Sequence, residues 1–199
     1  MKHAASPQST RDAILAAADR LLGKYGYKKM TIEDLANEVG IGKGSVYLHF
    51  ESKEEIALSH VDAIIERLKD SLRAIAAKNS GVEKRLCEML IARVIYRFDS
   101  VQHYSQSLNE LLSALRTKLL DRRRKYFDEE AKLIADVIEE GQKAGLFIKG
   151  DAMDLAKTFL SATNSLLPYS LSAYELGARS KVEERTRKTA SILIRGILK

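Results

Sequence analysis

The chain has 199 residues, of which 45% are hydrophobic and 30% charged, and its formal net charge is +6. That length is enough to bury a hydrophobic core, as one domain or two small ones. No apolar run reaches about 18 residues, which excludes a membrane-spanning helix, and the single cysteine, Cys87, excludes an intrachain disulfide. Because the start lacks an apolar secretory segment, we expect a cytoplasmic protein. Its positive charge suits an anionic partner, although solubility alone would also account for it.

Capping residues divide the first part of the chain into three short helices and one long helix. Gly26 ends the first apolar helical face. Thr31, with Asp34 three residues later, starts the second helix, and Ser52 with Glu55 starts the fourth. The helices are expected at residues 11–25, 32–40, 43–50 and 53–76, the third being only one or two turns long.

The remainder of the chain also has helical spacing of its apolar residues. Residues 82–98 form one helix, and the polar stretch "FDSVQHYS" after it is expected to interrupt the helical structure. Residues 105–144 contain neither proline nor, before Gly141, glycine, and we expect two helices there. Two more helices are predicted at 152–174 and 181–198. No strand pattern or internal repeat stands out, so the predicted fold class is all-α.

The segment "IGKGSVYLHFESKEEI", residues 41 to 56, is the first place to look for enzyme chemistry. The phosphate-loop pattern fails, because Gly42-Lys43 is followed by a further glycine and not by serine or threonine. His49 and His60 have no cysteine or paired ligand near them in the sequence, so no metal site is predicted. With no Ser/His/Asp or Cys/His grouping either, we expect neither an enzyme nor a bound cofactor.

The same segment fits a helix-turn-helix, in which a short second helix enters the DNA major groove. Val46 and Phe50 form the apolar side of that helix, and Gly44 lets its backbone come close to the duplex. Lys53 lies in the first turn of the next helix, where amide groups and an ammonium together favour a phosphate. The side chains able to face outward are Lys43, Ser45, Tyr47 and His49. The alternative for the tyrosine and the histidine is packing within a small helical domain.

From Thr10 to about Ile56 the sequence resembles the TetR family of transcriptional regulators. The match is carried by "ILAAADRLLGKYGYKKMTIEDLANEVGIGKGSVYLHFESKEEI". The resemblance implies phosphate contacts at Thr31, Ser45, Tyr47 and Lys53. It implies that Lys43, Gly44, Leu48 and His49 face or approach base edges. Leu48 departs from the aromatic residue that some members carry at its position, which leaves the identity of the base contacts open.

The resemblance also implies two domains. Residues 1–53 would form an N-terminal arm and the DNA-binding domain, and residues 54–199 a helical ligand-binding and dimerisation domain. In this family the two C-terminal helices form a homodimer interface. A dimer is physically sensible as well, since one short helix gives too few contacts for sharp site selection. Two-fold symmetry then predicts a palindromic operator in double-stranded DNA, with recognition helices about one DNA turn apart.

The larger domain contains aromatic and polar side chains from which a ligand cavity could be built. Pro168, within the helix expected at 152–174, would free a backbone carbonyl and bend the axis, which opens space between helices. The candidate ligand-binding residues are Tyr96, His103, Tyr104, Phe159 and Asn164, although each alone is more often a core residue. The basic run Arg122–Lys125 is followed by acidic residues and is interpreted as a salt-bridged surface, not as a second DNA-binding patch.

These observations favour a ligand-responsive repressor that binds its operator as a dimer and is released by a small hydrophobic or amphipathic compound. An activator, or a regulator without an effector, fits the same sequence. A helical interaction module that does not bind an operator is the alternative from a different functional class. The sequence does not fix the operator, the regulated genes or the ligand.

Overall fold

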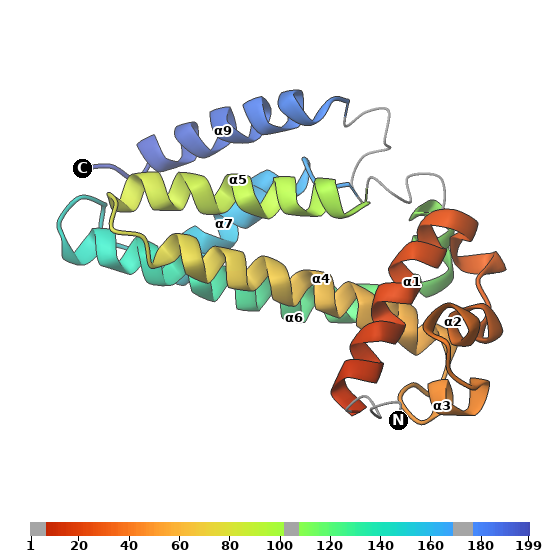
Figure 1. Ribbon diagram of the computed structural model, residues 1–199. Helices are drawn as coiled ribbons and strands as arrows, with labels where there is room; N and C mark the ends of the chain where they lie inside the picture. Colours follow the sequence, from red (N-terminus) through yellow and green to blue (C-terminus); the bar gives the residue numbers. More distant parts are fainter. Residues whose placement is uncertain (1–6, 102–107, 169–176) are drawn as a thin grey trace. The chain divides into compact units, whose positions relative to one another are not determined.

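The computed structural model describes residues 7–101, 108–168 and 177–199, and every element named there is an α-helix (Figure 1). The chain forms two compact units. The first contains the residues up to Ile64 together with the part of helix α6 up to Leu119, and the second contains the rest. The units therefore divide helix α4 after Ile64, whereas the domains predicted from sequence divide the chain at residue 53. None of the described helices is long and apolar enough to cross a membrane.

The first unit begins with three helices in the order that the caps predict. Gly26 has φ 76°, a left-handed conformation that interrupts α1 at the predicted stop. Thr31 and Asp34 form the predicted capping box of α2, and Gly40 ends this helix with φ 75°. Glu55 N–H donates to the Ser52 hydroxyl at 3.1 Å, as expected for a cap. The helices are α1 (Pro7–Lys29), α2 (Ile32–Val39), α3 (Lys43–Tyr47) and the start of α4 (Lys53–Ala76).

The core of the first unit comes from the apolar face predicted for the first helix and from the helices that follow. α1 packs against α2, and α2 against α3. Met30, which lies between the first two helices, is fully buried. The buried residues include Ile14, Ala17, Ala18, Leu21, Leu22, Leu35, Val46, Phe50 and Ile56. This core holds α3 by one side only, and the opposite side remains available.

The remaining helices differ from the sequence prediction in three places. The helix expected to end at Phe98 continues to Val101, and residues 108–143 form one helix of 36 residues instead of two. α7 ends at Asn164, so Pro168 follows the helix and does not bend it. The carbonyl four residues before a proline lacks its helical hydrogen bond, and α7 stops at that residue. These helices are α5 (Val82–Val101), α6 (Leu108–Lys143), α7 (Ala152–Asn164) and α9 (Arg179–Arg195).

The core of the second unit is a continuous hydrophobic cluster to which all these helices contribute. α5 runs beside α9, as Figure 1 shows, and α7 packs against both. The Phe147 ring packs against Gly141, where an added Cβ would lie 2.3 Å from a ring carbon. The cluster includes Leu72, Leu86, Met89, Leu90, Ile134, Ile138, Phe147, Phe159, Leu160 and Ile194.

Candidate nucleic-acid interface

Helix α3 presents one buried and one exposed side. Val46 and Phe50, the residues predicted to be apolar anchors, are 0% and 1% exposed. Tyr47 is 49% exposed and Leu48 is 84% exposed. An aliphatic side chain that is as exposed as Leu48 contributes no hydrophobic stabilisation to the fold. The exposed side of α3 therefore carries aromatic and aliphatic surface that the rest of its own unit does not use.

Gly44 lies on α3 without an internal reason to be glycine. Its φ is not in the left-handed region, and a Cβ built on it would meet nothing within 4 Å. Glycine in a helix costs about 0.5–1 kcal/mol relative to alanine. Open space in front of an exposed backbone is the arrangement needed when another molecule must approach that backbone closely.

The side chain of Thr31, a predicted phosphate contact, is occupied by the cap of α2. Its hydroxyl accepts a hydrogen bond from Asp34 N–H at 3.0 Å and donates to the Asp34 carboxylate at 2.7 Å. The Thr31 N–H also donates to that carboxylate, at 3.0 Å. The contact observed for Thr31 is therefore structural, and its role toward DNA stays a prediction.

The other predicted DNA-binding residues lie on α3 or directly after it. Lys43 and Gly44 are exposed in the first turn, and Ser45 and His49 are half-buried. Lys53 is half-buried and donates to backbone carbonyls in its own unit. Six of the eight predicted residues therefore lie on one short segment: Lys43, Gly44, Ser45, Tyr47, Leu48 and His49.

Arg11 supports the end of α3 and was not singled out from the sequence. Its guanidinium carbon lies 4.7 Å from the centre of the Phe50 ring, within the range of a cation–π contact. The same guanidinium donates to the Ser59 hydroxyl at 3.3 Å. An arginine in the first turns of a helix gives no sequence signal for this contact, because both partners are about 40 residues or more away along the chain.

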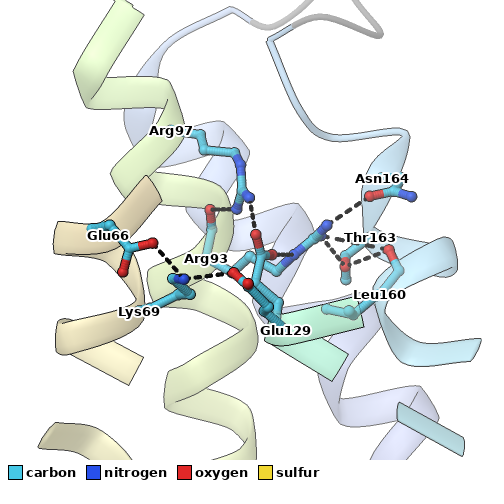
Figure 2. A network of polar contacts seen from close by, with 9 residues as sticks. Glu66, Lys69, Arg93, Arg97, Glu129, Leu160, Thr163 and Asn164 are labelled. Carbon is cyan, nitrogen blue, oxygen red and sulfur yellow. Dashed lines mark hydrogen bonds and ion pairs between the residues drawn. The ribbon is translucent and has the colours of Figure 1, made fainter. Parts of the chain in front are cut away.

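A second polar site lies inside the larger unit, where α5, α6 and α7 meet (Figure 2). Glu130 is fully buried between two buried arginines: Arg93 Nε donates to it at 2.7 Å, and Arg97 donates to its other oxygen. Arg93 also donates to Asn164 Oδ1 at 2.8 Å and to Thr163 Oγ1 at 3.2 Å. This cluster ties the end of α7 to α5 and α6.

A second set of ion pairs lies beside this cluster and involves α4. Lys69 Nζ pairs with Glu129 of α6 at 2.5 Å and with Glu66, one turn away on α4, at 2.6 Å. Figure 2 shows this pair of contacts beside the arginine–glutamate cluster. Three cations and three carboxylates, on α4, α5 and α6, therefore form two neighbouring sets of ion pairs. Buried charges of this kind are tolerated only when they are paired.

The pKa of the Glu130 carboxyl reflects two opposed effects. Burial is the largest and raises the pKa, but the charges of Arg97 and Arg93 and their hydrogen bonds together outweigh it and lower the pKa below the ordinary value of 4.5. Glu130 is therefore ionised at neutral pH. Within the three described ranges, no group of three His, Cys, Asp or Glu side chains is placed to hold a metal ion.

Comparisons with known proteins agree with the geometry of the first unit. Residues 14–59 match the family model described as "Bacterial regulatory proteins, tetR family". The match spans the helix-turn-helix and the start of α4. A transcriptional repressor of Mycolicibacterium smegmatis, KstR2, is 25% identical over 198 residues, covering 96% of this chain and 92% of its own. Residues 14–59 are therefore similar to the DNA-binding domain of the TetR family. Proteins of this family are transcriptional regulators and not enzymes.

Three further comparisons extend over most of the chain. The repressor DhaR of a Mycobacterium species is 28% identical over 157 residues, which is 77% of each chain. The solved structure of a Saccharomonospora viridis transcriptional regulator in complex with choline has a TM-score of 0.70 and 25% identity, covering 96% of this chain and 99% of its own. A TetR regulator from Haloarcula marismortui, with a TM-score of 0.76 and 22% identity, shares the fold.

The predicted ligand-binding residues that the structure describes differ from one another in their surroundings. Asn164 accepts a hydrogen bond from Arg93, Phe159 is buried in the main cluster, and Tyr96 is half-buried against it. His103 and Tyr104 lie outside the described residues. The structure thus connects one of the five predicted residues to a polar network that the sequence analysis had missed. The available signal was a pair of arginines, four residues apart, on the apolar face of the helix at 82–98.

Proposed function

We propose that this protein is a TetR-like repressor that binds a palindromic operator as a homodimer and is released by a small-molecule effector. The observation that carries the DNA-binding part is the exposed side of α3. There, Tyr47 and Leu48 stand in solvent beside a glycine with open space in front of it. An aliphatic side chain at a groove-reading position suits the methyl group of thymine.

A repressor is favoured over an activator by the relatives that match most of the chain. KstR2 and DhaR are both repressors by name. Homodimerisation follows from the size of the reading element, because α3 has five residues and gives few base contacts by itself. We place the dimer interface on the C-terminal helices. α9 exposes 63% of Ile192, whereas Phe159 of α7 and Ile197 are buried in their own chain.

The effector is proposed to act at the cluster of Arg93, Arg97 and Glu130. A compound that competes for the Arg93 guanidinium would break its bonds to Asn164 and Thr163, and this would loosen the end of α7. Glu129, the neighbour of Glu130 on α6, pairs with Lys69 of α4. Since α4 begins at Lys53, directly after the helix-turn-helix, a shift of α4 would alter how α3 is presented. Such coupling between two ligands is typically about 1–3 kcal/mol and reciprocal.

The first experiment is footprinting of the purified protein on the DNA that flanks its own gene, at two salt concentrations. We expect protection of a palindrome that weakens as salt rises, because phosphate contacts release counterions. Tyr47→Ala is expected to abolish the footprint. Its matched control is Leu146→Ala, which truncates a similarly exposed side chain in the other unit. Equal protection by Tyr47→Ala and the wild type would contradict the proposed interface and favour an interaction module.

The effector proposal is tested on the same operator complex. Small molecules are screened for release of the bound DNA, beginning with amphipathic carboxylates, because a carboxylate can compete for the Arg93 guanidinium. Asn164→Ala removes one of the bonds that the effector is proposed to break, so operator affinity without effector should fall toward the effector-bound value and the effector should have less influence. If no compound changes operator affinity, the chain acts as an effector-independent regulator.

A further inference from the structure

Lys53 is the first residue of α4, and its ammonium group is directed toward the end of another helix. Lys53 Nζ donates to the backbone carbonyl of Tyr27 at 3.0 Å and to that of Lys28 at 3.3 Å. It also lies 4.6 Å from the centre of the Tyr27 ring. An ammonium has three N–H donors, so two of them are used within the protein and the ring covers part of the charge.

The two carbonyls need this donor because of how α1 ends. Gly26 interrupts the helix, and Met30 N–H bonds to the Gly26 carbonyl at 3.1 Å. In a continuing helix the Thr31 N–H would bond to the Tyr27 carbonyl, but it donates to the Asp34 carboxylate in the cap of α2. Carbonyls at a helix end require a partner from elsewhere. Lys53 provides it from a position 25 and 26 residues along the chain.

The position of Lys53 on its own helix also indicates that these contacts stabilise the fold. The N-terminus of a helix carries partial positive charge, so a lysine at the first residue is locally unfavourable. Glu54 and Glu55, the next two residues, have the charge that this end of α4 favours. Lys53 nevertheless places a cation at the first position. Its contacts with the carbonyls and with the Tyr27 ring offset the local repulsion.

We propose that Lys53 is a positioning residue that closes the helix-turn-helix segment, and not a phosphate contact. Its partners lie just before α2, and Lys53 itself lies just after α3. One ammonium group therefore joins the two ends of the stretch, residues 30–52, that carries both DNA-binding helices. Without it, a smaller fraction of molecules presents α3 in the binding-competent arrangement, which lowers the apparent affinity by that fraction. This inference rests on the proposed DNA-binding function.

The salt dependence of operator binding separates the two roles. We expect Lys53→Met to lower operator affinity about tenfold, the effect of losing charge-assisted hydrogen bonds at a half-buried site. The slope of log affinity against log salt should stay unchanged, because no phosphate contact is lost. A phosphate contact would instead reduce the slope by about 0.9 for each protomer bound. Lys53→Gln keeps N–H donors without the charge, and we expect its affinity to lie between those of the wild type and Lys53→Met. A slope reduced equally in both variants would overturn the proposal.

A measurement without DNA tests the contact itself. Tyr27→Leu removes the ring but leaves the backbone carbonyl, and chemical unfolding of the two single variants and the double variant forms a thermodynamic cycle. We expect the unfolding constants to deviate from independence by about threefold, as for a partly exposed cation–π contact. Independent effects would overturn the proposed contact. If the wild type binds no operator, the proposed function fails, while this cycle still decides whether Lys53 holds the two ends together.

Discussion

Replacement of Gly44 by alanine separates the contribution of α3 to folding from its contribution to DNA binding. The added methyl group meets no atom within 4 Å, and the backbone is not left-handed at this residue. Alanine is favoured over glycine in a helix by up to about 1 kcal/mol, and we expect about half of that so close to the start of a short helix. For a chain of this size, such a gain raises the melting temperature by about 1–2 °C.

Operator affinity should change in the opposite direction. A methyl group on the exposed backbone of α3 would hold the helix away from the duplex, and we expect at least a tenfold loss, equivalent to about 1.4 kcal/mol. The assays are thermal unfolding followed by circular dichroism and operator titration followed by fluorescence anisotropy. Gly81→Ala is the matched control, since its Cβ also meets nothing within 4 Å and it lies in the second unit. If Gly44→Ala is stable and binds with wild-type affinity, the backbone of α3 does not approach DNA closely.

Two further predictions concern the buried cluster. Glu130→Gln leaves two buried guanidinium groups without their carboxylate and should destabilise the protein by about 3–5 kcal/mol, as measured by urea unfolding at neutral pH. Glu139→Gln, on the same helix in an exposed pair with Lys143 at 3.5 Å, should change stability by less than about 1 kcal/mol, and equal effects would show that burial is unimportant. The pKa of Glu130 is lowered on folding, so its ionisation stabilises the folded state above the ordinary pKa of 4.5. That contribution is lost as the pH falls through the lower folded-state pKa, and urea midpoints measured between pH 7 and pH 3 should decline less steeply in Glu130→Gln than in the wild type.

The parts of the fold that follow from neighbouring residues were predictable from the sequence. The cap of α2 at Thr31 and its stop at Gly40 involve residues within one turn of each other, and the structure confirms both. The division of residues 105–144 into two helices was wrong, because it relied on typical helix length where the sequence has no breaking residue. The bend at Pro168 was also wrong, since the helix ends before the proline.

The polar contacts could not be predicted, because each depends on residues far apart in the chain. Arg93 meets Glu130 and Asn164, which are 37 and 71 residues away. From its sequence position, Lys53 was interpreted as a phosphate contact. Only the fold reveals that its ammonium group donates hydrogen bonds to backbone carbonyls of α1. The buried and exposed residues of α3 were easier to predict. The alternation of buried and exposed residues from Val46 to Phe50 is short-range, and the structure reproduces the two apolar anchors.

The cluster of Arg93, Arg97 and Glu130 also constrains how this sequence can diverge. Loss of one member leaves an uncompensated charge in the interior, whereas replacement of a buried ionic triad by apolar side chains of similar volume is often neutral or stabilising. Sequences that keep only one or two of the three charged residues are therefore the least stable, and any path of single substitutions passes through them. Descendants of this gene are expected to keep all three residues or to lose them together. Such joint inheritance would mark the cluster in related sequences even where overall identity is low.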